Sequence, residues 1–275
     1  MKHSRTILIS LFLVSVLVGC RPTPKYLTIL HTNDTHSQIE PTQANEGGYA
    51  RRMGVIKAER ELDPELLLLD AGDFCQGTPY FNIYKGRVEV DAMNRMGYDA
   101  ATLGNHEFDN GLDTLAVILK GANFPIVCAN YDVTGTPLEG VVKPYTILRR
   151  KGVKIGIFGL GVSPEGLIDS KNFAPVKYLD PYEKAAEMVD ILKKKHCEVI
   201  ICLSHLGTYP IIEGDVPSDA QLAARVSGID MIVGGHTHQL YDIHLPNPDG
   251  VELPVRQMAK SGRFFGKCIL HLEEK

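Results

Sequence analysis

Five short stretches of the sequence place acidic, amide or imidazole side chains directly after an apolar run. A single stretch of this kind would be ordinary turn chemistry, because Asp, Asn and Gly are common turn formers. Five of them, each at the carboxyl end of an expected strand, indicate one shared site. The stretches are HTNDTHSQ, DAGDFCQG, GNHEFDNG, CLSHLG and GGHTHQ, and their side chains of interest are Asp34, His36, Asp73, Asn105, His106, Asp109, His205, His236 and His238.

These residue types suit the binding of divalent metal ions. Carboxylate and amide oxygens and imidazole nitrogens are the donors that hard to borderline metals accept. No cysteine is among the proposed ligands, which argues against a structural zinc site built from thiolates. A carboxylate that bridges two ions can hold them about 3.5–4 Å apart, the separation that suits phosphoryl chemistry. Each ion then polarises a phosphoryl oxygen, and water with a lowered pKa attacks in line.

The rest of the chain alternates apolar, strand-like segments with helical ones. This alternation predicts an α/β fold with mixed sheets, helices packed outside and active groups on the loops after strands. A hairpin over 142–161 is expected to turn at 150–152, and 255–275 to form a closing strand. The other expected strands are 26–30, 65–73, 99–107, 124–130, 198–207 and 229–239, and the expected helices are 47–63, 88–97, 112–122, 181–197 and 218–228.

The N-terminal segment is predicted to be a signal peptide and not part of the fold. Lys2 and Arg5 form a basic start, and the apolar run over 6–18 is too short to span a bilayer comfortably. The segment ends in LVGC, which resembles a bacterial lipobox. We therefore expect 1–19 to be a lipoprotein signal peptide, Cys20 to be lipidated and 20–25 to be a tether. An ordinary secretory signal is the alternative, and either one predicts export to the cell envelope of a bacterium, facing the periplasm or the cell surface.

Composition excludes some classes of protein. Without residues 1–19 the chain has 27 basic and 33 acidic residues, a net charge of −6, which argues against a protein that binds nucleic acid by neutralising phosphates. No later stretch approaches the roughly 20 apolar residues of a membrane helix, so membrane contact is expected only through the lipid. The five remaining cysteines, an odd number without repeated spacing, do not indicate a disulfide framework. A disulfide through Cys128 or Cys197 stays open, because export permits one.

In their order, the five stretches resemble the motifs of the calcineurin-like metallophosphoesterase superfamily. More narrowly, they resemble the metallophosphatase domain of the bacterial 5'-nucleotidase/UDP-sugar hydrolase family, whose pattern GGYARR at 47–52 also fits. The resemblance covers essentially all of 26–275. It implies a four-layer α-β-β-α sandwich with two mixed sheets. It also implies a phosphoesterase that hydrolyses phosphate monoesters, with 5'-nucleotides as the expected substrates.

The resemblance also implies a role for each residue of the five stretches. It implies two divalent ions, and Mn, Zn, Fe and Co all remain open. The implied ligands are Asp34, His36 and His238 at the first ion, Asp73 as a bridge, and Asn105, His205 and His236 at the second. Relatives often carry Gln or Asn where this chain has His238, which leaves the metal preference open.

His106 is expected to face the substrate phosphate and to be held by Asp109, the usual logic of a histidine oriented by a carboxylate. It would stabilise the transition state or protonate the leaving group. We expect Asn105 and His106 to point in opposite directions, as adjacent residues at a strand exit do.

Cys75 is expected to be a buried spacer, with oxidant sensitivity as the alternative. We expect His31 to be a satisfied core residue, and His196, His244 and His271 to lie at the surface or at strand edges.

The substrate is less well determined than the metal centre. Full-length hydrolases of the resembled family carry a C-terminal domain that supplies the nucleoside pocket, and this sequence stops where the first domain stops. We therefore expect either a phosphatase of broad or weak specificity, or a separate chain that supplies the missing domain. The alternatives to a phosphate monoester are a cyclic phosphodiester, the pyrophosphate of a nucleotide sugar or a thiosulfate ester. A surface-binding lipoprotein without catalytic activity is the alternative from another class.

Overall fold

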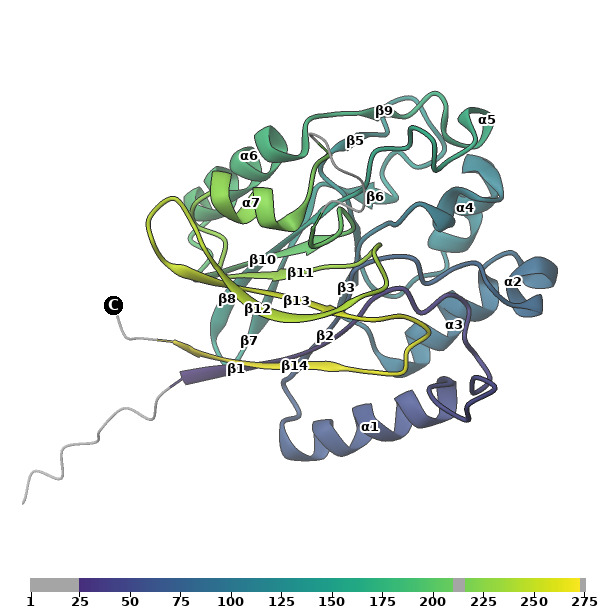
Figure 1. Ribbon diagram of the computed structural model, residues 1–275, viewed down its shortest axis with the longest axis horizontal. Coiled ribbons are helices and arrows are strands. Elements are labelled where there is room, and N and C mark those ends of the chain that lie inside the picture. The colour runs from purple at the N-terminus through teal and green to yellow at the C-terminus, as the bar shows by residue number, and fades with distance from the viewer. Residues whose placement is uncertain (1–24, 210–215, 273–275) are drawn as a thin grey trace, which may run out of the picture.

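The computed structural model describes residues 25–209 and 216–272 (Figure 1). The expected signal peptide, Cys20 and most of the expected tether lie outside these residues. In the described part, two six-stranded sheets face each other, and a small third sheet pairs β5 (Tyr131–Asp132) with β9 (Lys177–Tyr178). The fold class predicted from the sequence, an α/β sandwich with two mixed sheets, is confirmed.

The first sheet is parallel except at its β14 edge. Strand β1 pairs antiparallel with β14 and parallel with β2, and the remaining pairs are parallel. In spatial order its strands are β14 (Gly266–Leu272), β1 (Lys25–Thr32), β2 (Leu67–Asp70), β3 (Ala100–Ala101), β4 (Ile126–Val127) and β6 (Val142–Lys143).

The second sheet has a parallel centre between two antiparallel edges. In spatial order its strands are β12 (Leu240–Pro246), β13 (Glu252–Met258), β11 (Met231–Val233), β10 (Val199–Ser204), β8 (Val153–Leu160) and β7 (Tyr145–Arg150). The β7–β8 hairpin pairs Arg150 with Val153 around Lys151 and Gly152, whose φ angles are 51° and 78°. Positive φ at both central residues is typical of a type I′ hairpin turn, which confirms the predicted turn.

Three apolar clusters show that the sheets and helices form four layers. One cluster fills the space between the sheets, with Ile29 and Leu69 from the first and Ile155 and Ile201 from the second. A second cluster joins the first sheet to α1 (Tyr49–Leu62), α2 (Pro79–Tyr84), α3 (Arg87–Met96) and α4 (Gly111–Leu119). The third joins the second sheet to α6 (Pro181–Lys194) and α7 (Asp219–Arg225).

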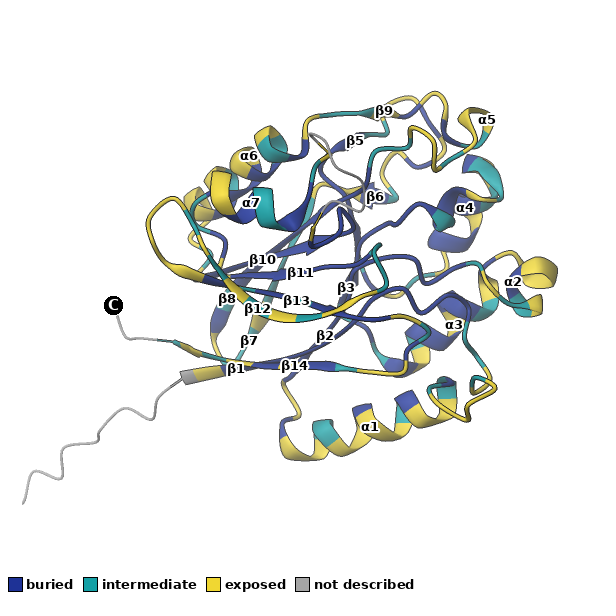
Figure 2. Ribbon diagram, in the orientation of Figure 1, coloured by how far each residue is buried: buried dark blue, intermediate teal, exposed yellow. Residues whose placement is uncertain are grey.

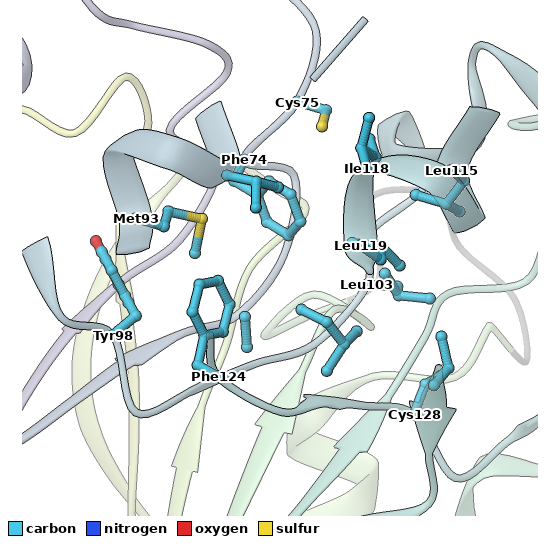
Figure 3. Packing of buried hydrophobic residues seen from close by; sticks show 14 of the residues in the cluster. Phe74, Cys75, Met93, Tyr98, Leu103, Leu115, Ile118, Leu119, Phe124 and Cys128 are labelled. Carbon is cyan, nitrogen blue, oxygen red and sulfur yellow. The ribbon is translucent and has the colours of Figure 1, made fainter. Parts of the chain in front are cut away.

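The layers follow from which face of each strand or helix is apolar. Successive residues of a strand point to opposite faces, so Ile29 of β1 faces the other sheet while Leu30 faces the helices. Figure 2 shows central strands such as β2 and β10 buried, while the edge strand β12 and the outer faces of the helices are exposed. Figure 3 shows part of the cluster under the helices, where Leu119 of α4 lies beside Leu103.

Helix α6 shows how the sequence sets the ends of a helix. The Asp180 side chain accepts hydrogen bonds from the backbone N–H groups of Tyr182 and Glu183, and Pro181 occupies the first turn. Both features are favoured at a helix start. Lys193 and Lys194 lie in the last turn, where cations complement the helix dipole. The predicted helix over 181–197 is thus confirmed, and its C-terminal lysines are exposed.

Several predicted strands differ from the structure. Those expected over 124–130 and 229–239 are shorter, at Ile126–Val127 and Met231–Val233, and residues 142–143 of the expected hairpin form β6 in the first sheet. The expected closing strand over 255–275 is two strands in different sheets, β13 and β14, because the chain turns at 259–262 between them. The expected strand over 99–107 is reduced to Ala100–Ala101. It stops before the site because a Cβ at Gly104 would lie 2.2 Å from Asp73 Oδ1, so the chain there must pass close to that carboxylate. Strand β12 and the short helix α2 were not predicted.

His31 also differs from expectation. Its side chain is 0% exposed, and neither ring nitrogen has a hydrogen-bond partner among the described residues. Burial, reinforced by the charge of Arg256, lowers the pKa of His31 to about 3. The ring therefore packs as a neutral group against Gly266, so the prediction of a hydrogen-bonded core histidine was wrong. The expectations for His196, His244 and His271 are confirmed, since all three are exposed.

The five described cysteines are all free thiols, and four of them are buried. Neither Cys128 nor Cys197 forms a disulfide in the described part of the chain. Among the same residues, no helix is both long and apolar enough to cross a membrane.

Replacing Gly266 by alanine should destabilise the fold. A Cβ at this position would lie 1.8 Å from Nε2 of His31, a buried ring that must move to admit it. Overpacking of this kind costs about 1–3 kcal/mol, so the urea midpoint of Gly266→Ala should fall. Gly54→Ala is the matched control, because nothing lies within 4 Å of its added Cβ on helix α1. That variant should gain up to about 1 kcal/mol from helix propensity. An unchanged midpoint for Gly266→Ala would contradict the packing described here.

Candidate metal centre

The loops that leave the parallel strands of both sheets meet at one edge of the sandwich. Asp34 follows β1 and Asp73 follows β2 in the first sheet, while His205 follows β10 and His236 follows β11 in the second. Their ligand atoms gather into two groups, each with all its atoms within 4.8 Å of one another, and Asp73 belongs to both. The groups are Asp34, His36, Asp73 and His238, and Asp73, His205 and His236.

The first group directs imidazole nitrogens toward carboxylate oxygens. His36 Nε2 lies 2.8 Å from His238 Nε2, and His238 Nε2 lies 3.4 Å from Asp34 Oδ1. His36 Nε2 lies 3.9 Å from Asp34 Oδ1 and 4.0 Å from Asp73 Oδ2. Two imidazole nitrogens beside two carboxylates form a donor set that suits a divalent cation.

The second group has a histidine whose tautomer can be assigned. The Nδ1 of His205 lies 2.6 Å from the carbonyl oxygen of Ala71, which can only accept, so Nδ1 must donate. Nε2 then faces Asp73 Oδ2 at 3.1 Å. Burial opposes a charge on His205, but the carboxylates of Asp73 and Asp34 outweigh it and raise its pKa to about 10. Positive charge is therefore favoured between His205 and Asp73, and a backbone acceptor on the other nitrogen is usual for a metal-binding histidine. The residues present fit a metal ion.

Asn105, the remaining predicted ligand, joins the second group. Its Oδ1 lies 3.1 Å from Nδ1 of His236. Burial lowers the pKa of His236 to about 4, with the nearby charge of His205 as the next cause, so its ring is held neutral and its unprotonated nitrogen is able to act as a ligand. All seven predicted ligands are thus brought to one place by the fold.

The backbone of the predicted ligands is itself unusual. Five of them have φ in the left-handed region, which costs non-glycine residues of order 1–3 kcal/mol each and persists only where the surroundings impose it. Here the surroundings are hydrogen bonds between the loops. Asp34 N–H donates to Gly72 O at 2.9 Å, and His36 N–H donates to Asp73 O at 3.0 Å. The five φ angles are Asp34 48°, His36 46°, Asp73 53°, His236 77° and His238 58°.

His106 and Asp109 form the predicted pair at the edge of the centre. Nδ1 of His106 lies 3.0 Å from Asp109 Oδ2, and the two side chains are 31% and 33% exposed. The backbone N–H of His106 donates to Asp73 Oδ1 at 2.9 Å. Burial opposes protonation of His106, but the hydrogen bond to Asp109 and the charge of Asp73 outweigh it and raise its pKa.

The side chains of Asn105 and His106 were expected to diverge because adjacent residues at a strand exit point in opposite directions. That reason was wrong. These residues do not continue a strand. They begin a 3₁₀ turn, η1 (His106–Phe108), and Asn105 itself has helical φ and ψ of −78° and −32°. Successive side chains in a 3₁₀ turn diverge by about a third of a turn, because three residues complete one turn. That rotation directs Asn105 toward His236 and leaves His106 partly exposed at the edge of the centre.

An open depression of about 230 Å³ lies over the first group. His36 and His238 of the first group line it, as does His106. The complete lining is His36, Gln38, Gln76, Gly77, His106, His238, Lys260 and Ser261. A phosphate ester could therefore approach the ligand groups directly from solvent.

Glu107 is a buried residue of the centre that was not predicted. Its carboxylate accepts hydrogen bonds from three backbone N–H groups: those of Asp73 (2.9 Å) and Gly104 (2.6 Å) at Oε2, and that of Cys75 (3.0 Å) at Oε1. Burial, followed by the charge of Asp73, raises the pKa of Glu107 to about 7. The residue ties the loop after β2 to the loop after β3. Its position next to His106 in GNHEFDNG was the available signal.

Asn33 was also missed and performs a similar function on the other side. Its Nδ2 donates to Asp34 Oδ2 at 2.5 Å and to Ala259 O at 2.8 Å, while its Oδ1 accepts from Met258 N–H at 2.7 Å. The side chain thereby joins the loop after β1 to the end of β13. Cys75, by contrast, is fully buried, and burial raises the pKa of its thiol well above the usual value, which supports the buried-spacer interpretation.

Comparison with known proteins gives sequence relatives over most of the chain. The sequence profile of the family described as calcineurin-like phosphoesterase matches residues 27–240. The 5'-nucleotidase of Bos taurus is 34% identical over 301 residues, covering 99% of this chain and 51% of the bovine protein. The snake venom 5'-nucleotidase of Gloydius brevicauda is 35% identical over 277 residues, covering 90% of this chain and 46% of the venom protein. The chain spans about half the length of these relatives.

Solved structures give the same picture. The crystal structure of a 5'-nucleotidase precursor from Thermus thermophilus superposes with a TM-score of 0.82 at 36% identity, covering 90% of this chain and 52% of that one. A calcineurin-like phosphoesterase from Bacillus subtilis superposes with a TM-score of 0.77 at 31% identity, covering 92% of this chain and 87% of that one.

The substitution Glu107→Gln should lower both the stability of the fold and the metal content of the centre. The substitution places an NH₂ group where one carboxylate oxygen now accepts a backbone N–H, leaving a buried donor without an acceptor. The free energy of unfolding should fall by about 1–3 kcal/mol, measured by urea denaturation. Metal content after dialysis, measured by mass spectrometry, should also fall, because the loop that carries Asp73 loses its anchor. Glu61→Gln, on the exposed face of α1, serves as the control. Wild-type metal content and stability in Glu107→Gln would refute the anchoring role.

Proposed function

The chain belongs to the calcineurin-like phosphoesterase family, and from this premise we propose that it hydrolyses phosphate monoesters with the help of two divalent metal ions. The family is one of metal-dependent phosphoric ester hydrolases, and its relatives here include 5'-nucleotidases. The expected substrates are therefore 5'-nucleotides. The observation that carries the proposal is that two ligand groups share Asp73 beneath an open depression.

Each group has enough donors for one ion. Asp34, His36 and His238 would hold the first, His205, His236 and Asn105 the second, and Asp73 would contribute to both. The chemistry that bound divalent ions supply at such a site is polarisation of phosphoryl oxygens and activation of water. Mn, Zn, Fe and Co all accept this donor set.

His106 supplies a proton at a defined atom. Because Asp109 accepts the hydrogen bond of Nδ1, a protonated His106 has its second N–H, at Nε2, available at the rim of the depression. This proton can stabilise the charge of the transition state or pass to the leaving oxygen. Asp109 orients the ring and favours its protonated form, so it is a positioning residue.

The first experiment tests metal dependence and His106 together. The protein is stripped with a chelator, reloaded with Mn or Zn, and assayed for phosphate release from an aryl phosphate and from AMP. We expect activity only after reloading, and a loss of about 10²–10⁴-fold in His106→Ala with unchanged metal content. Phosphate release that survives both chelation and His106→Ala would refute the proposal. Faster cleavage of bis-aryl phosphate than of the monoester would favour the phosphodiesterase alternative.

A series of aryl phosphates separates the two roles of His106. If Nε2 protonates the leaving oxygen, the loss in His106→Ala should increase with the pKa of the leaving phenol. If the side chain only stabilises the transition state, the loss should be the same across the series. AMP adds a further comparison, since good turnover of AMP by this chain would show that these residues recognise the nucleoside.

We also propose that the protein is exported and anchored through a lipid on Cys20, supported by the LVGC sequence alone. The residue lies outside the described part of the chain. In a bacterial host fed labelled palmitate, the wild type should carry the label and sediment with membranes. Cys20→Ser should lose the label and move to the soluble envelope fraction. Equal membrane association of both proteins without any label would contradict lipidation.

A further inference from the structure

Lys260 is a cationic residue of the depression that the proposed metal chemistry does not use. It lines the depression together with His36, His106 and His238, and it is exposed to solvent. Among the residues that the structure describes, no carboxylate forms an ion pair with it, whereas Lys151, Lys171, Lys184 and Lys267 all have acidic partners. Its ammonium is therefore free to bind an anion that enters the depression.

The backbone holds Lys260 in a fixed relation to the metal ligands. Its neighbours Ala259 and Ser261 have φ angles of 50° and 63°, in the left-handed region that non-glycine residues rarely occupy. Ser261 N–H donates to Asp34 O at 2.7 Å, and Ala259 N–H donates to Gln239 O at 3.0 Å. The turn that carries Lys260 is thus hydrogen-bonded to Asp34 of the first ligand group and to Gln239, which follows His238. These bonds set the backbone on both sides of Lys260, whose side chain is exposed to solvent.

His106 and Lys260 both line the depression, together with His36 and His238. The ring of His36 contacts that of His106, with centroids 5.4 Å apart, and that of His238, with centroids 4.8 Å apart. The turn of Lys260 follows β13, which pairs with β12 just after His238. Apart from the histidines, the remaining lining side chains, Gln38, Gln76 and Ser261, are neutral. A substrate with one phosphate beside His36 and His238 would place a second anionic group in the depression that Lys260 also lines.

We propose that Lys260 binds a second phosphate group of the substrate and so favours phosphoanhydrides such as nucleoside diphosphates over monoesters with a neutral leaving group. The inference rests on the proposed function. In the reaction, water adds to the terminal phosphorus, and the bond from that phosphorus to the bridging oxygen breaks. The bridging oxygen keeps the electron pair and becomes part of the departing monophosphate. The products are orthophosphate and the monophosphate, with one proton released.

Equilibrium binding provides the first test, because it needs no turnover. Calorimetry on the full chain loaded with metal would compare inorganic phosphate with methylenediphosphonate, whose P–C–P bridge cannot be hydrolysed. The wild type should bind the diphosphonate more tightly. Lys260→Met should weaken diphosphonate binding by about five-fold, the upper range for a solvent-exposed charge pair, and leave phosphate binding unchanged. Lys260→Arg should retain most of the preference.

Lys57→Met is the matched control, since it removes the same charge from the exposed face of α1. The kinetic counterpart is the ratio of kcat/KM for ADP to that for an aryl phosphate, which should fall in Lys260→Met chiefly through KM. Equal binding of phosphate and diphosphonate by the wild type would overturn the inference, as would equal weakening of both ligands in Lys260→Met. Absence of aryl phosphate hydrolysis by the wild type would instead count against the proposed function. The calorimetric test of Lys260 would still give an answer in that case, because it measures binding and not turnover.

Discussion

The centre depends on the placement of one buried carboxylate, Asp73. Its Oδ2 faces His205 and His36, and its Oδ1 accepts the backbone N–H of His106. Its own backbone adopts a left-handed conformation that Glu107 stabilises by accepting its N–H. Both ligand groups include Asp73, and the backbone of His106 is held by the same side chain. A displacement of this one residue would therefore disturb both groups and His106 together.

The four-layer fold brings Asp73 to this place through burial. The apolar cluster between the sheets aligns the parallel strands of both, so that the loops after β1 and β2 meet those after β10 and β11. Hydrogen bonds by side chains then fix the loops. Glu107 joins the loops after β2 and β3, and Asn33 joins the loop after β1 to the end of β13. Apolar packing thus sets the approximate positions, and buried polar contacts set the final ones.

Much of this could be predicted from the sequence, because side-chain chemistry and hydrophobic period are local signals. The strand–helix alternation predicted an α/β fold, and the five polar stretches at strand exits indicated the side chains that the fold brings together. Which of them are ligands was implied by the family resemblance. The rest depends on contacts between distant residues. Strand β3 is short because Gly104 passes close to Asp73. His31 has no hydrogen-bond partner in the described part of the chain because it packs on Gly266 from another strand. Likewise, the roles of Glu107 and Lys260 depend on loops that meet only in the folded chain. Hydrophobic periodicity does not predict which loops meet.

The charges and strain of the centre explain why folding and ion binding should be linked in this protein. Asp34, Asp73 and Glu107 are all fully or almost fully buried within one small region, and isolated buried carboxylates are costly. His205, whose pKa is raised by two of these acids, offsets part of that cost. Five ligands in left-handed conformations add to it. A divalent cation bound by the folded state alone would offset both terms, since ligand binding stabilises the state that binds it. The free energy of unfolding is therefore expected to rise with the occupancy of the centre.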